Sequence, residues 1–552
     1  MRKIYFQGFF LLLFGLFASM VGINKTIPED KKVEVSQIEI LNKRLPLYIG
    51  RSNVDPFSVK FNVTNNSGPL ILNSVEISFT PLSKTSGITE IVISHEGTTM
   101  PTAVNSTFGS TTTITDLIKI KGTMELESGI HFLNVNFNLK NNPDLLTSVQ
   151  VKTVKLSFKN HTDILINPKE RFIYQPAMIL RSSGQDQIDT YRIPGLVTTK
   201  NGTLIAVYDN RRNNSKDLQE DIDIGMSRST DGGQTWQGMK VIMDIGEYGG
   251  RSNRLNGIGD PCVLYDSKTN TIWVAALWMS GATSDQMLWW ASKPGLKPDE
   301  TGQFILVKST DDGLSWSQPI NITEQIKEPG WQLLLQGPGR GITMKNGTLV
   351  FPAQFKSDLG AKSLDGGQYT CHSTIVYSQD SGNTWKIGTG ARSNTTESQV
   401  VELADGNLML NMRDDRNRTD KSETNGRAVS ITSDYGKTWT KHPSSNSALQ
   451  EPNCMASLIS ADLSISGKLQ QVLFFSNPDS KTDRNHMTIK ASLDGGLTWP
   501  NAFQMELNDE KGFGYSCLTM VDQKTIGIVY EGVKELYFQK IAVSDLLGKL
   551  VK

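Results

Sequence analysis

Arginine, carboxylate and tyrosine side chains recur at one position of a repeated pattern that begins near residue 176. Segments of strand-like sequence start with Arg192 in YRIPG, Asp260 in GDPCV, Glu397 in ESQVVEL and Tyr515 in GYSCL. A guanidinium group binds a carboxylate through two parallel hydrogen bonds, carboxyl groups transfer protons, and a phenol can act as a nucleophile. Ionisable groups that converge on one place are typical of a functional site.

The elements that carry these residues form a repeat in which an apolar strand follows a polar turn. The repeat occurs six times, at 201–209, 269–278, 346–354, 405–414, 469–478 and 523–531. Repeated units that contain strands predict a β-propeller, and six strands in the same phase predict six blades. Strands from both ends of the region are expected to complete the sixth blade, which removes exposed edges. Rotation about the propeller axis would then bring the polar strand ends together at one mouth, with Arg211 and Arg413 on the paired strands.

A second repeat, Ser/Thr-x-Asp-x-Gly-x-Thr/Ser-Trp, lies between the strands. It occurs at 229–236, 309–316, 378–385, 432–439 and 492–499. The Asp and Ser/Thr side chains can bond backbone N–H groups in a turn, the Gly permits positive φ, and the Trp can pack between neighbouring blades. Five equivalent copies around a ring cannot all face one substrate, so this box predicts a hairpin fastener and the chemistry is expected elsewhere.

The region before the propeller shows a different pattern, in which apolar and polar residues alternate. Phe57, Val59, Phe61 and Val63 are one example of this period-two pattern. Such alternation predicts half-buried antiparallel strands, and we expect a β-sandwich over residues 25–175 followed by the propeller over 176–552. The sandwich either binds carbohydrate or only supports the second domain.

The charge balance and the cysteine content bear on whether the chain binds nucleic acid or a metal. The 552 residues contain 56 Lys and Arg and 56 Asp and Glu, so the balanced charge gives no indication of nucleic-acid binding. The four cysteines are far apart and show no metal-ligand spacing, so we expect buried thiols, with a disulfide as the alternative, and no metal site: Cys262, Cys371, Cys454 and Cys517.

The N-terminus has the pattern of a secretory signal. Arg2 and Lys3 precede an apolar run over residues 9–22 that contains small residues at its end. The run is shorter than the roughly 20 residues that span a membrane. We therefore expect a signal peptide over 1–22, no stable membrane insertion, and export to the periplasm or the extracellular space, with an uncleaved anchor as the alternative.

The chain resembles the bacterial exo-α-sialidases, or neuraminidases, that carry Asp-box (BNR) repeats. The resemblance covers 176–552 and rests on the ordered combination of YRIP, five boxes, separated arginines and a late GYS tyrosine. The first domain is similar, less specifically, to the carbohydrate-binding-like domain of some sialidases. The resemblance implies a retaining enzyme that releases terminal α-linked sialic acid from glycans through a covalent tyrosyl-enzyme intermediate, without a cofactor.

The resemblance also assigns expected roles to residues that bind the sugar. Arg192, Arg413 in LNMRD and Arg484 in KTDRNHM match the three arginines that bind the sugar's carboxylate. A single arginine of this kind could equally form a surface ion pair. Arg211 matches a further pocket arginine, in preference to its neighbour at 212, and Asp260 matches the aspartate that contacts the sugar's hydroxyl and amide region.

Three further residues match the catalytic positions of the family. Asp217 resembles the acid/base aspartate, with Asp221 and Asp223 as rivals on the same loop. Tyr515 matches the nucleophile and Glu397 its partner. The anomeric carbon of sialic acid bears a carboxylate, which would repel an anionic nucleophile but not a neutral phenol. A phenol of pKa about 10 is about one part in a thousand ionised at pH 7, and Glu397 as a base would compensate for this.

Two alternatives use the same residues. One is a trans-sialidase or an intramolecular trans-sialidase, which rim residues such as Trp278, Trp331 or Tyr369 would decide. The other is a catalytically silent lectin that binds sialic acid, although a lectin has no need of the catalytic trio.

Overall fold

The computed structural model describes residues 33–551 except 52–54, 65–67, 82, 98–105, 171, 282 and 285. The expected signal peptide, residues 1–22, lies outside the described residues. Strands dominate the fold, and its three α-helices in the described part have only four or five residues each: α1 (Leu288–Ala291), α2 (Thr323–Ile326) and α3 (Val543–Leu547).

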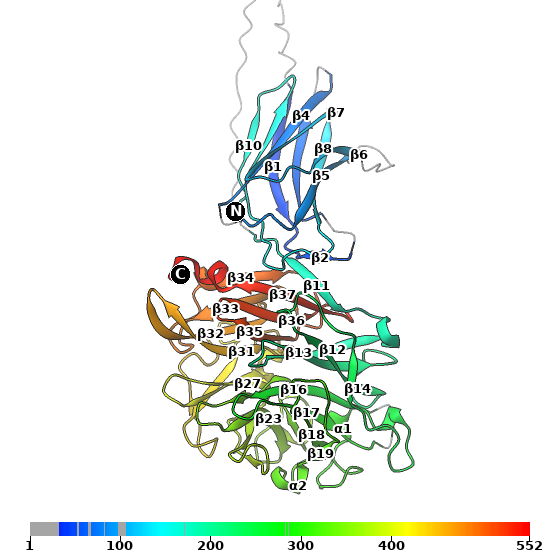
Figure 1. The fold of residues 1–552 in the computed structure, drawn as a ribbon, viewed down its shortest axis with the longest axis vertical. Helices are drawn as coiled ribbons and strands as arrows, with labels where there is room; N and C mark the ends of the chain where they lie inside the picture. The colour runs from blue at the N-terminus through cyan, green and yellow to red at the C-terminus, as the bar shows by residue number, and fades with distance from the viewer. Residues whose placement is uncertain are drawn as a thin grey trace, which may run out of the picture.

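Two antiparallel sheets form the N-terminal part, drawn at the top of Figure 1. Their strand orders are β1-β3-β8-β5-β6 and β10-β9-β4-β7. The strands are β1 (Glu34–Asn42), β3 (Phe57–Thr64), β4 (Leu70–Phe79), β5 (Ile88–Gly97), β6 (Ser106–Thr111), β7 (Leu117–Leu126), β8 (Gly129–Leu139), β9 (Val151–Phe158) and β10 (Ile164–Ile166).

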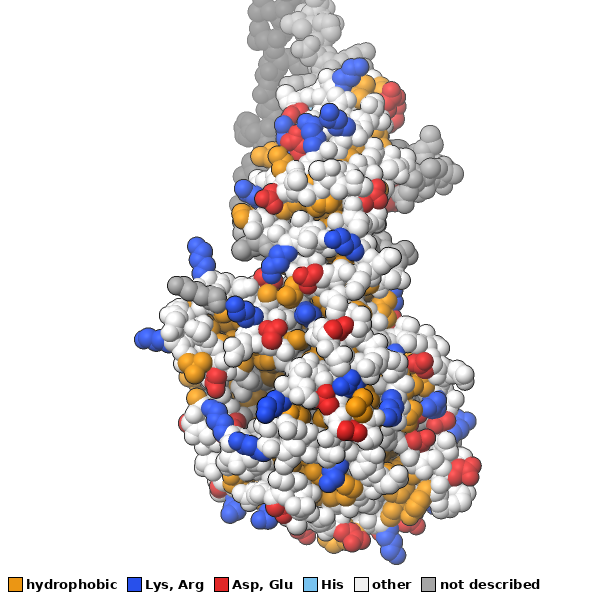
Figure 2. Space-filling view, viewed as in Figure 1, with side chains coloured by type: hydrophobic (Ala, Val, Ile, Leu, Met, Phe, Trp, Pro, Cys, Tyr) orange, Lys and Arg blue, Asp and Glu red, His pale blue; other side chains and the backbone are white. Residues whose placement is uncertain are grey.

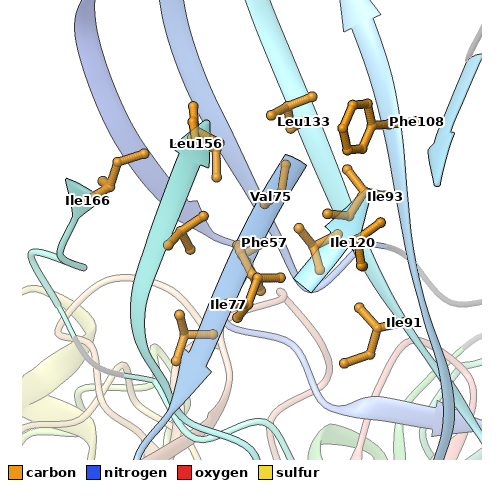
Figure 3. Close-up of a cluster of buried hydrophobic side chains, with 14 of the residues drawn as sticks. Phe57, Val75, Ile77, Ile91, Ile93, Phe108, Ile120, Leu133, Leu156 and Ile166 are labelled. Atoms are coloured by element: carbon orange, nitrogen blue, oxygen red, sulfur yellow. The ribbon is translucent and has the colours of Figure 1, made fainter. Parts of the chain in front are cut away.

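One apolar core lies between these two sheets. Phe57 of β3 and Leu133 of β8 come from the first sheet, and Val75 of β4 and Leu156 of β9 come from the second. Figure 3 shows these side chains pointing toward one another. The predicted alternation is confirmed, because every second residue of β3 from Phe57 onward is fully buried.

Six further sheets follow one another along the chain. Their strands are β12 (Thr190–Thr198), β13 (Leu204–Arg211), β14 (Ile222–Ser229) and β15 (Lys240–Met243); β16 (Ile258–Asp266), β17 (Thr271–Trp278), β18 (Gln303–Ser309), β19 (Ile320–Asn321) and β21 (Gly339–Arg340); β20 (Leu333–Gln336), β22 (Ile342–Thr343), β23 (Leu349–Ser357), β24 (Thr370–Ser378), β25 (Lys386–Ile387) and β26 (Arg392–Ser393); β27 (Thr395–Glu402), β28 (Leu408–Asp414), β29 (Ala428–Thr432) and β30 (Thr440–Lys441); β31 (Ser457–Ile465), β32 (Lys468–Pro478), β33 (Met487–Ser492) and β34 (Gln504–Asn508); and β2 (Leu47–Ile49), β11 (Pro176–Arg181), β35 (Ser516–Asp522), β36 (Thr525–Glu531) and β37 (Leu536–Ala542).

One strand from each of these six sheets takes part in a closed series of contacts. β12 contacts β16, β16 contacts β22, β22 contacts β27, β27 contacts β31, β31 contacts β35, and β35 contacts β12. Apolar clusters fill the spaces between neighbouring sheets, as Val207 of β13 and Val274 of β17 illustrate. Each sheet is therefore buried on both faces, which explains why its central strand is largely apolar.

The last sheet joins the two ends of the region, as the sequence predicts. Its strand order is β2-β11-β37-β36-β35, so β11 comes from the start of the region and β35 to β37 come from its end. The outermost strand, β2, was not predicted, because it belongs to the N-terminal part and pairs in parallel with β11. Leu47 and Tyr48 of β2 are buried, and the strand covers an edge that would otherwise be open.

The boxes fasten hairpins, as predicted. In the first box, Asp231 accepts hydrogen bonds from the backbone N–H of Thr235 at 2.9 Å and from its hydroxyl at 2.6 Å, and Gly233 N–H donates to Ser229 at 2.9 Å. The other four boxes repeat this arrangement. The Trp236 ring lies 5.1 Å from the ring of Phe538 in the last sheet, so the box also joins neighbouring sheets.

Three other features of the described residues bear on expectations from the sequence: the cysteines, the helices and the surface charges. All four cysteines are buried free thiols, which confirms the first of the two expectations for them. Across the described residues, no helix is long and apolar enough to cross a membrane. Figure 2 shows acidic and basic side chains interspersed on the face in view, with no large area of one sign.

Candidate active site

Local backbone irregularities direct polar side chains to the start of the inner strands. Ile193, Asp260 and Asn453 have φ of 57°, 59° and 59°, in the left-handed region that such residues seldom adopt. The pairing of β12 with β13 shifts between Arg192 and Gly195, and that of β16 with β17 shifts near Asp260. A bulge of this kind re-aims the neighbouring side chains and is common beside active sites.

A cavity of about 370 Å³ lies where these strand ends meet. Its ionisable lining residues include Asp217, Asp260, Glu397, Arg413 and Tyr515. Its apolar lining residues are Leu218, Leu277, Met287, Leu288, Trp289, Trp290, Leu333 and Leu335. The cavity can therefore hold a ligand that has both charged groups and apolar substituents.

Tyr515, Glu397 and Arg413 form one hydrogen-bonded group. The Tyr515 hydroxyl donates to Glu397 Oε1 at 2.5 Å, and Arg413 Nη1 donates to Glu397 Oε2 at 2.6 Å and to Tyr515 Oη at 3.1 Å. Burial, and then the Glu397 carboxylate, raise the pKa of Tyr515 well above its usual value. The phenol is therefore neutral and is bonded to a base that can accept its proton.

Arg192 is fixed by a buried carboxylate. Its Nε and Nη2 atoms lie 3.1 and 3.4 Å from the two oxygens of Glu531, which is fully buried. Glu531 also accepts hydrogen bonds of 2.8 Å from the backbone N–H groups of Ile193 and Tyr515. One side chain thus positions both the arginine and the tyrosine.

Arg211 links two aspartates. Its Nε and Nη2 donate to Asp209 Oδ2 at 3.1 and 2.9 Å, and its Nη1 donates to Asp217 Oδ1 at 2.6 Å. Asp209 also accepts a 2.8 Å hydrogen bond from the backbone N–H of Asp260. Arg211 is fully buried, so it holds the aspartates of the site in place rather than lying open to solvent.

Asp217 stands at the opening of the cavity, with 49% of its side chain exposed. Burial alone would raise its pKa, but the charges of Arg211 and then Arg192 lower the pKa of Asp217 below its usual value. Arg192 Nη1 lies 3.5 Å from its Oδ1. The two cations thus favour the ionised form of the carboxyl group.

Arg484 and Asp260 complete the set of predicted residues. Arg484 donates to the carbonyl of Phe513 at 2.9 Å and to that of Asn453 at 3.3 Å, and its guanidinium lies 5.6 Å from the centre of the Tyr515 ring. Burial, and then the charges of nearby aspartates, raise the pKa of Asp260 well above its usual value. Five of the eight predicted residues thus line the cavity, and the other three, Arg192, Arg211 and Arg484, contact Asp217 or the Tyr515 ring.

The rival residues lie elsewhere. Arg212 donates to Asp223 at 2.7 Å, and neither these two residues nor Asp221 lines the cavity. Trp278 is buried, and the Trp331 ring stacks on Phe355 at 4.1 Å.

No role was assigned from the sequence to three further residues of the site. Asp209 and Glu531 anchor Arg211 and Arg192, and Asn453 Oδ1 accepts from Arg413 at 2.8 Å. The sequence does contain a signal for two of them, a carboxylate at the end of an apolar strand, in Tyr208-Asp209 and Tyr530-Glu531. A carboxylate that is buried in such a place needs a cation beside it. Within the described residues, no group of His, Cys, Asp and Glu is arranged to hold a metal ion.

Comparison with known proteins identifies the family. A model described as a BNR repeat-like domain matches residues 193–501. A sialidase of Bacteroides fragilis (strain YCH46) is 46% identical over 432 residues, which cover 78% of this chain and 76% of that relative. The chain belongs to the sialidase family. The solved Hadza microbial sialidase Hz136 has a TM-score of 0.77 and 38% identity, and the match covers 92% of this sialidase and all 100% of that chain.

A more distant likeness concerns the fold alone. The intramolecular trans-sialidase from Ruminococcus gnavus, solved in complex with oseltamivir carboxylate, is 18% identical with a TM-score of 0.54. The match covers 67% of this chain and 98% of that one. The sialidase described here thus has the propeller-type fold of its family, and its enzyme class is that of the exo-α-sialidases, which are glycoside hydrolases.

The buried position of Glu531 leads to a first prediction. Glu531→Gln removes the charge that pairs with Arg192 and places an amide N–H₂ among groups that only donate. We expect kcat/KM for a sialoside to fall by about 10- to 100-fold and the free energy of unfolding to fall by about 3 kcal/mol. Steady-state kinetics and denaturant unfolding measure both, and Glu423→Gln, which changes the fully exposed partner of Lys481, is the control. Unchanged kinetics in Glu531→Gln would mean that the pair does not position the site.

Proposed function

We propose that this sialidase hydrolyses terminal α-linked sialic acid from glycoconjugates with retention of configuration, through a covalent bond between Tyr515 Oη and the anomeric carbon. The observation that carries the proposal is the 2.5 Å hydrogen bond from Tyr515 to Glu397, both of which line the cavity. A buried tyrosine bonded to a carboxylate, with arginines on its other sides, fits a nucleophile and its base.

Recognition of the substrate rests on three arginines around Tyr515. Arg192 and Arg484 lie over the Tyr515 ring, at 5.1 and 5.6 Å, and Arg413 donates to its hydroxyl. Guanidinium groups bind carboxylates with hydrogen bonds of about 1.5–3 kcal/mol each. We infer that the three bind the carboxylate of sialic acid and so select this sugar over neutral ones.

The first chemical step then needs two proton transfers. Tyr515 Oη attacks the anomeric carbon while its proton passes to Glu397 Oε1, and Asp217 donates a proton to the departing glycosidic oxygen. In the second step Asp217 removes a proton from water, which attacks the anomeric carbon and releases Tyr515, whose oxygen regains its proton from Glu397. A neutral phenol suits this carbon because the adjacent carboxylate of the substrate would repel an anion.

The proposal also covers the domain architecture of the chain and its export. We infer a β-sandwich over residues 25–175 and a six-bladed propeller over 176–552, supported by two sheets around one core and six sheets in a closed series. A signal peptide over 1–22 would export the enzyme to the periplasm or the extracellular space.

The test of the function is release of sialic acid from an aryl α-sialoside, followed by NMR of the first-formed product. The proposal expects free sialic acid as the α-anomer. An anhydro sugar would favour an intramolecular trans-sialidase, and transfer to an added sugar would favour a trans-sialidase. Binding of sialic acid without turnover would favour a lectin.

The pH dependence provides a second prediction. In the free enzyme, cations lower the pKa of Asp217, so little of the acid is protonated at neutral pH. A bound substrate carboxylate neutralises Arg192, and the pKa of Asp217 then rises. The fall in activity at high pH should therefore lie at higher pH for kcat than for kcat/KM. Profiles of kcat and of kcat/KM from pH 4 to 9 test this prediction. It would be contradicted if both quantities fell at the same high pH.

A further inference from the structure

A second cavity, of about 340 Å³, lies at the opposite end of the inner strands from the candidate active site. Strand β12 has Arg192 near its start and Thr198 at its end, and Thr198 lines the second cavity. Strand β27 has Glu397 near its start, in the first cavity, and Glu402 at its end, in the second. At about 3.3 Å per residue, Arg192 and Thr198 lie roughly 20 Å apart along their strand. The second cavity is therefore separate from the place of the sialidase chemistry.

The guanidinium group of Arg340, on the short strand β21, is weakly bonded within the chain. Its Nη1 lies 3.3 Å from the carbonyl oxygen of Leu518 and 3.4 Å from the hydroxyl oxygen of Thr519, and both distances are long for a charged donor. Its Nε is buried without a partner, and Nη2 has no hydrogen bond to any described residue. Arg340 lines the second cavity and is partly exposed there, so a ligand in the cavity can reach the guanidinium group.

The charge of Arg340 has no counter-ion among the described residues. Arg192, Arg211 and Arg413 each bond a carboxylate at 2.6 to 3.1 Å. Arg340 forms no such ion pair with a described Asp or Glu, and burial lowers its pKa. A guanidinium group stays charged in proteins, so placing one away from water without a carboxylate costs free energy. This cost indicates an anion that binds together with a ligand of the cavity.

The rest of the lining suits a ligand that has hydroxyl groups. Glu402 and Asp462 line the cavity, and both lie beside Lys345: Glu402 accepts its backbone N–H at 2.7 Å, and Asp462 Oδ2 is 3.9 Å from its Nζ. Carboxylates accept hydrogen bonds from hydroxyl groups, and the side chains of Ser460 and Gln471 also line the cavity and can do so. An inorganic anion would leave most of this volume unfilled. The cavity therefore favours a molecule with one anionic group and several hydroxyl groups.

We propose that this cavity binds a sugar that carries an oxyanion, a carboxylate or a phosphate group, with the oxyanion paired to Arg340 and hydroxyl groups bonded to Glu402 and Asp462. A guanidinium group forms two parallel hydrogen bonds with either kind of oxyanion. The site is additional to the one that binds the substrate, because the residues of the candidate active site lie at the other end of the inner strands. The two sites can therefore be occupied at the same time.

The test measures binding of two probes, glucuronate and glucose 6-phosphate, by isothermal titration calorimetry while a sialic acid analogue saturates the candidate active site. We expect the native enzyme to bind at least one probe, and Arg340→Met to bind it about 10- to 100-fold more weakly, as for loss of a charge-assisted hydrogen bond. Binding of glucuronate alone identifies a sugar acid as the ligand, and binding of glucose 6-phosphate alone identifies a sugar phosphate.

A cation at the edge of the same cavity provides the control. Lys345 is 65% exposed, so Lys345→Met should change the Kd by no more than about threefold. Equal losses in Lys345→Met and Arg340→Met would reduce the binding to general attraction between charges and overturn the site. Lack of binding of both probes to the native enzyme, or equal binding to Arg340→Met, would also overturn it.

Thermal unfolding tests the missing counter-ion itself. In a buffer of low salt without oxyanions, Arg340→Met should unfold at the same temperature as the native enzyme or at a higher one, because the variant removes a charge that nothing compensates. The bound probe should raise the Tm of the native enzyme and not that of the variant. A clearly lower Tm of Arg340→Met without the probe would show that the chain already compensates the charge, and would contradict the proposal. The activity of Arg340→Met on an aryl α-sialoside should equal the native value, so a failure of the proposed function is seen separately.

Discussion

Tyr515→Phe is expected to lower kcat on an aryl α-sialoside by about 10³-fold or more, because the ring remains while the attacking oxygen is removed. Removal of a nucleophile is among the most costly changes in an active site. The arginines keep their places, since Arg192 is held by Glu531 and Arg413 by Glu397 and Asn453. We therefore expect a sialic acid analogue to bind Tyr515→Phe with a Kd within about tenfold of the native value.

A matched control distinguishes loss of chemistry from loss of structure. Tyr530 is also buried in the last sheet, and its hydroxyl donates to Gln539 at 2.8 Å. Tyr530→Phe should retain most of the activity. Comparable activity in Tyr515→Phe and Tyr530→Phe would remove Tyr515 from its role, and loss of binding along with turnover would point to a folding defect.

Asp217→Asn should lower kcat/KM on a sugar-linked sialoside by about 10²- to 10⁴-fold, the usual contribution of a general acid. The amide keeps the shape of the side chain but cannot donate and recover a proton. A nitrophenyl leaving group needs little protonation, so the loss on that substrate should be much smaller. The comparison of the two substrates measures the role of Asp217 directly.

The neighbouring aspartate provides the control for this experiment. Asp221 is on the same loop but does not line the cavity. Asp221→Asn should therefore leave both substrates unaffected. Equal losses on the two substrates in Asp217→Asn would show that Asp217 positions the arginines and is not the acid.

Much of the site could be predicted from the sequence because the repeats show which residues of each unit lie at the start of an inner strand. Arg192, Asp260 and Tyr515 occupy equivalent places at the start of inner strands, so a ring of such strands brings them together. The choice of Asp217 over its rivals rested on the family resemblance. In the structure Arg211 bonds to Asp217, whereas Arg212 bonds to Asp223.

Other features depend on contacts that have no local pattern. Strand β2 has three residues, too few for an alternation, and its partner lies some 130 residues away in the sequence. Glu531 ends an apolar strand, but its bonds to Arg192 and Ile193 join residues more than 300 positions apart. The contacts of the Trp289 and Trp290 rings with Lys356 depend on the buried ion pair between Lys356 and Asp365, which only the folded chain brings together.

Trapping the proposed covalent intermediate on Tyr515 is the most direct test of the mechanism. The native enzyme and Tyr515→Phe are treated with 2,3-difluorosialic acid, digested, and analysed by mass spectrometry. We expect loss of fluoride from the anomeric carbon and a 3-fluorosialyl adduct on the peptide that contains Tyr515, in the native enzyme and not in the variant. An adduct on Glu397 or Asp217, or inhibition by the reagent without any adduct, would contradict it.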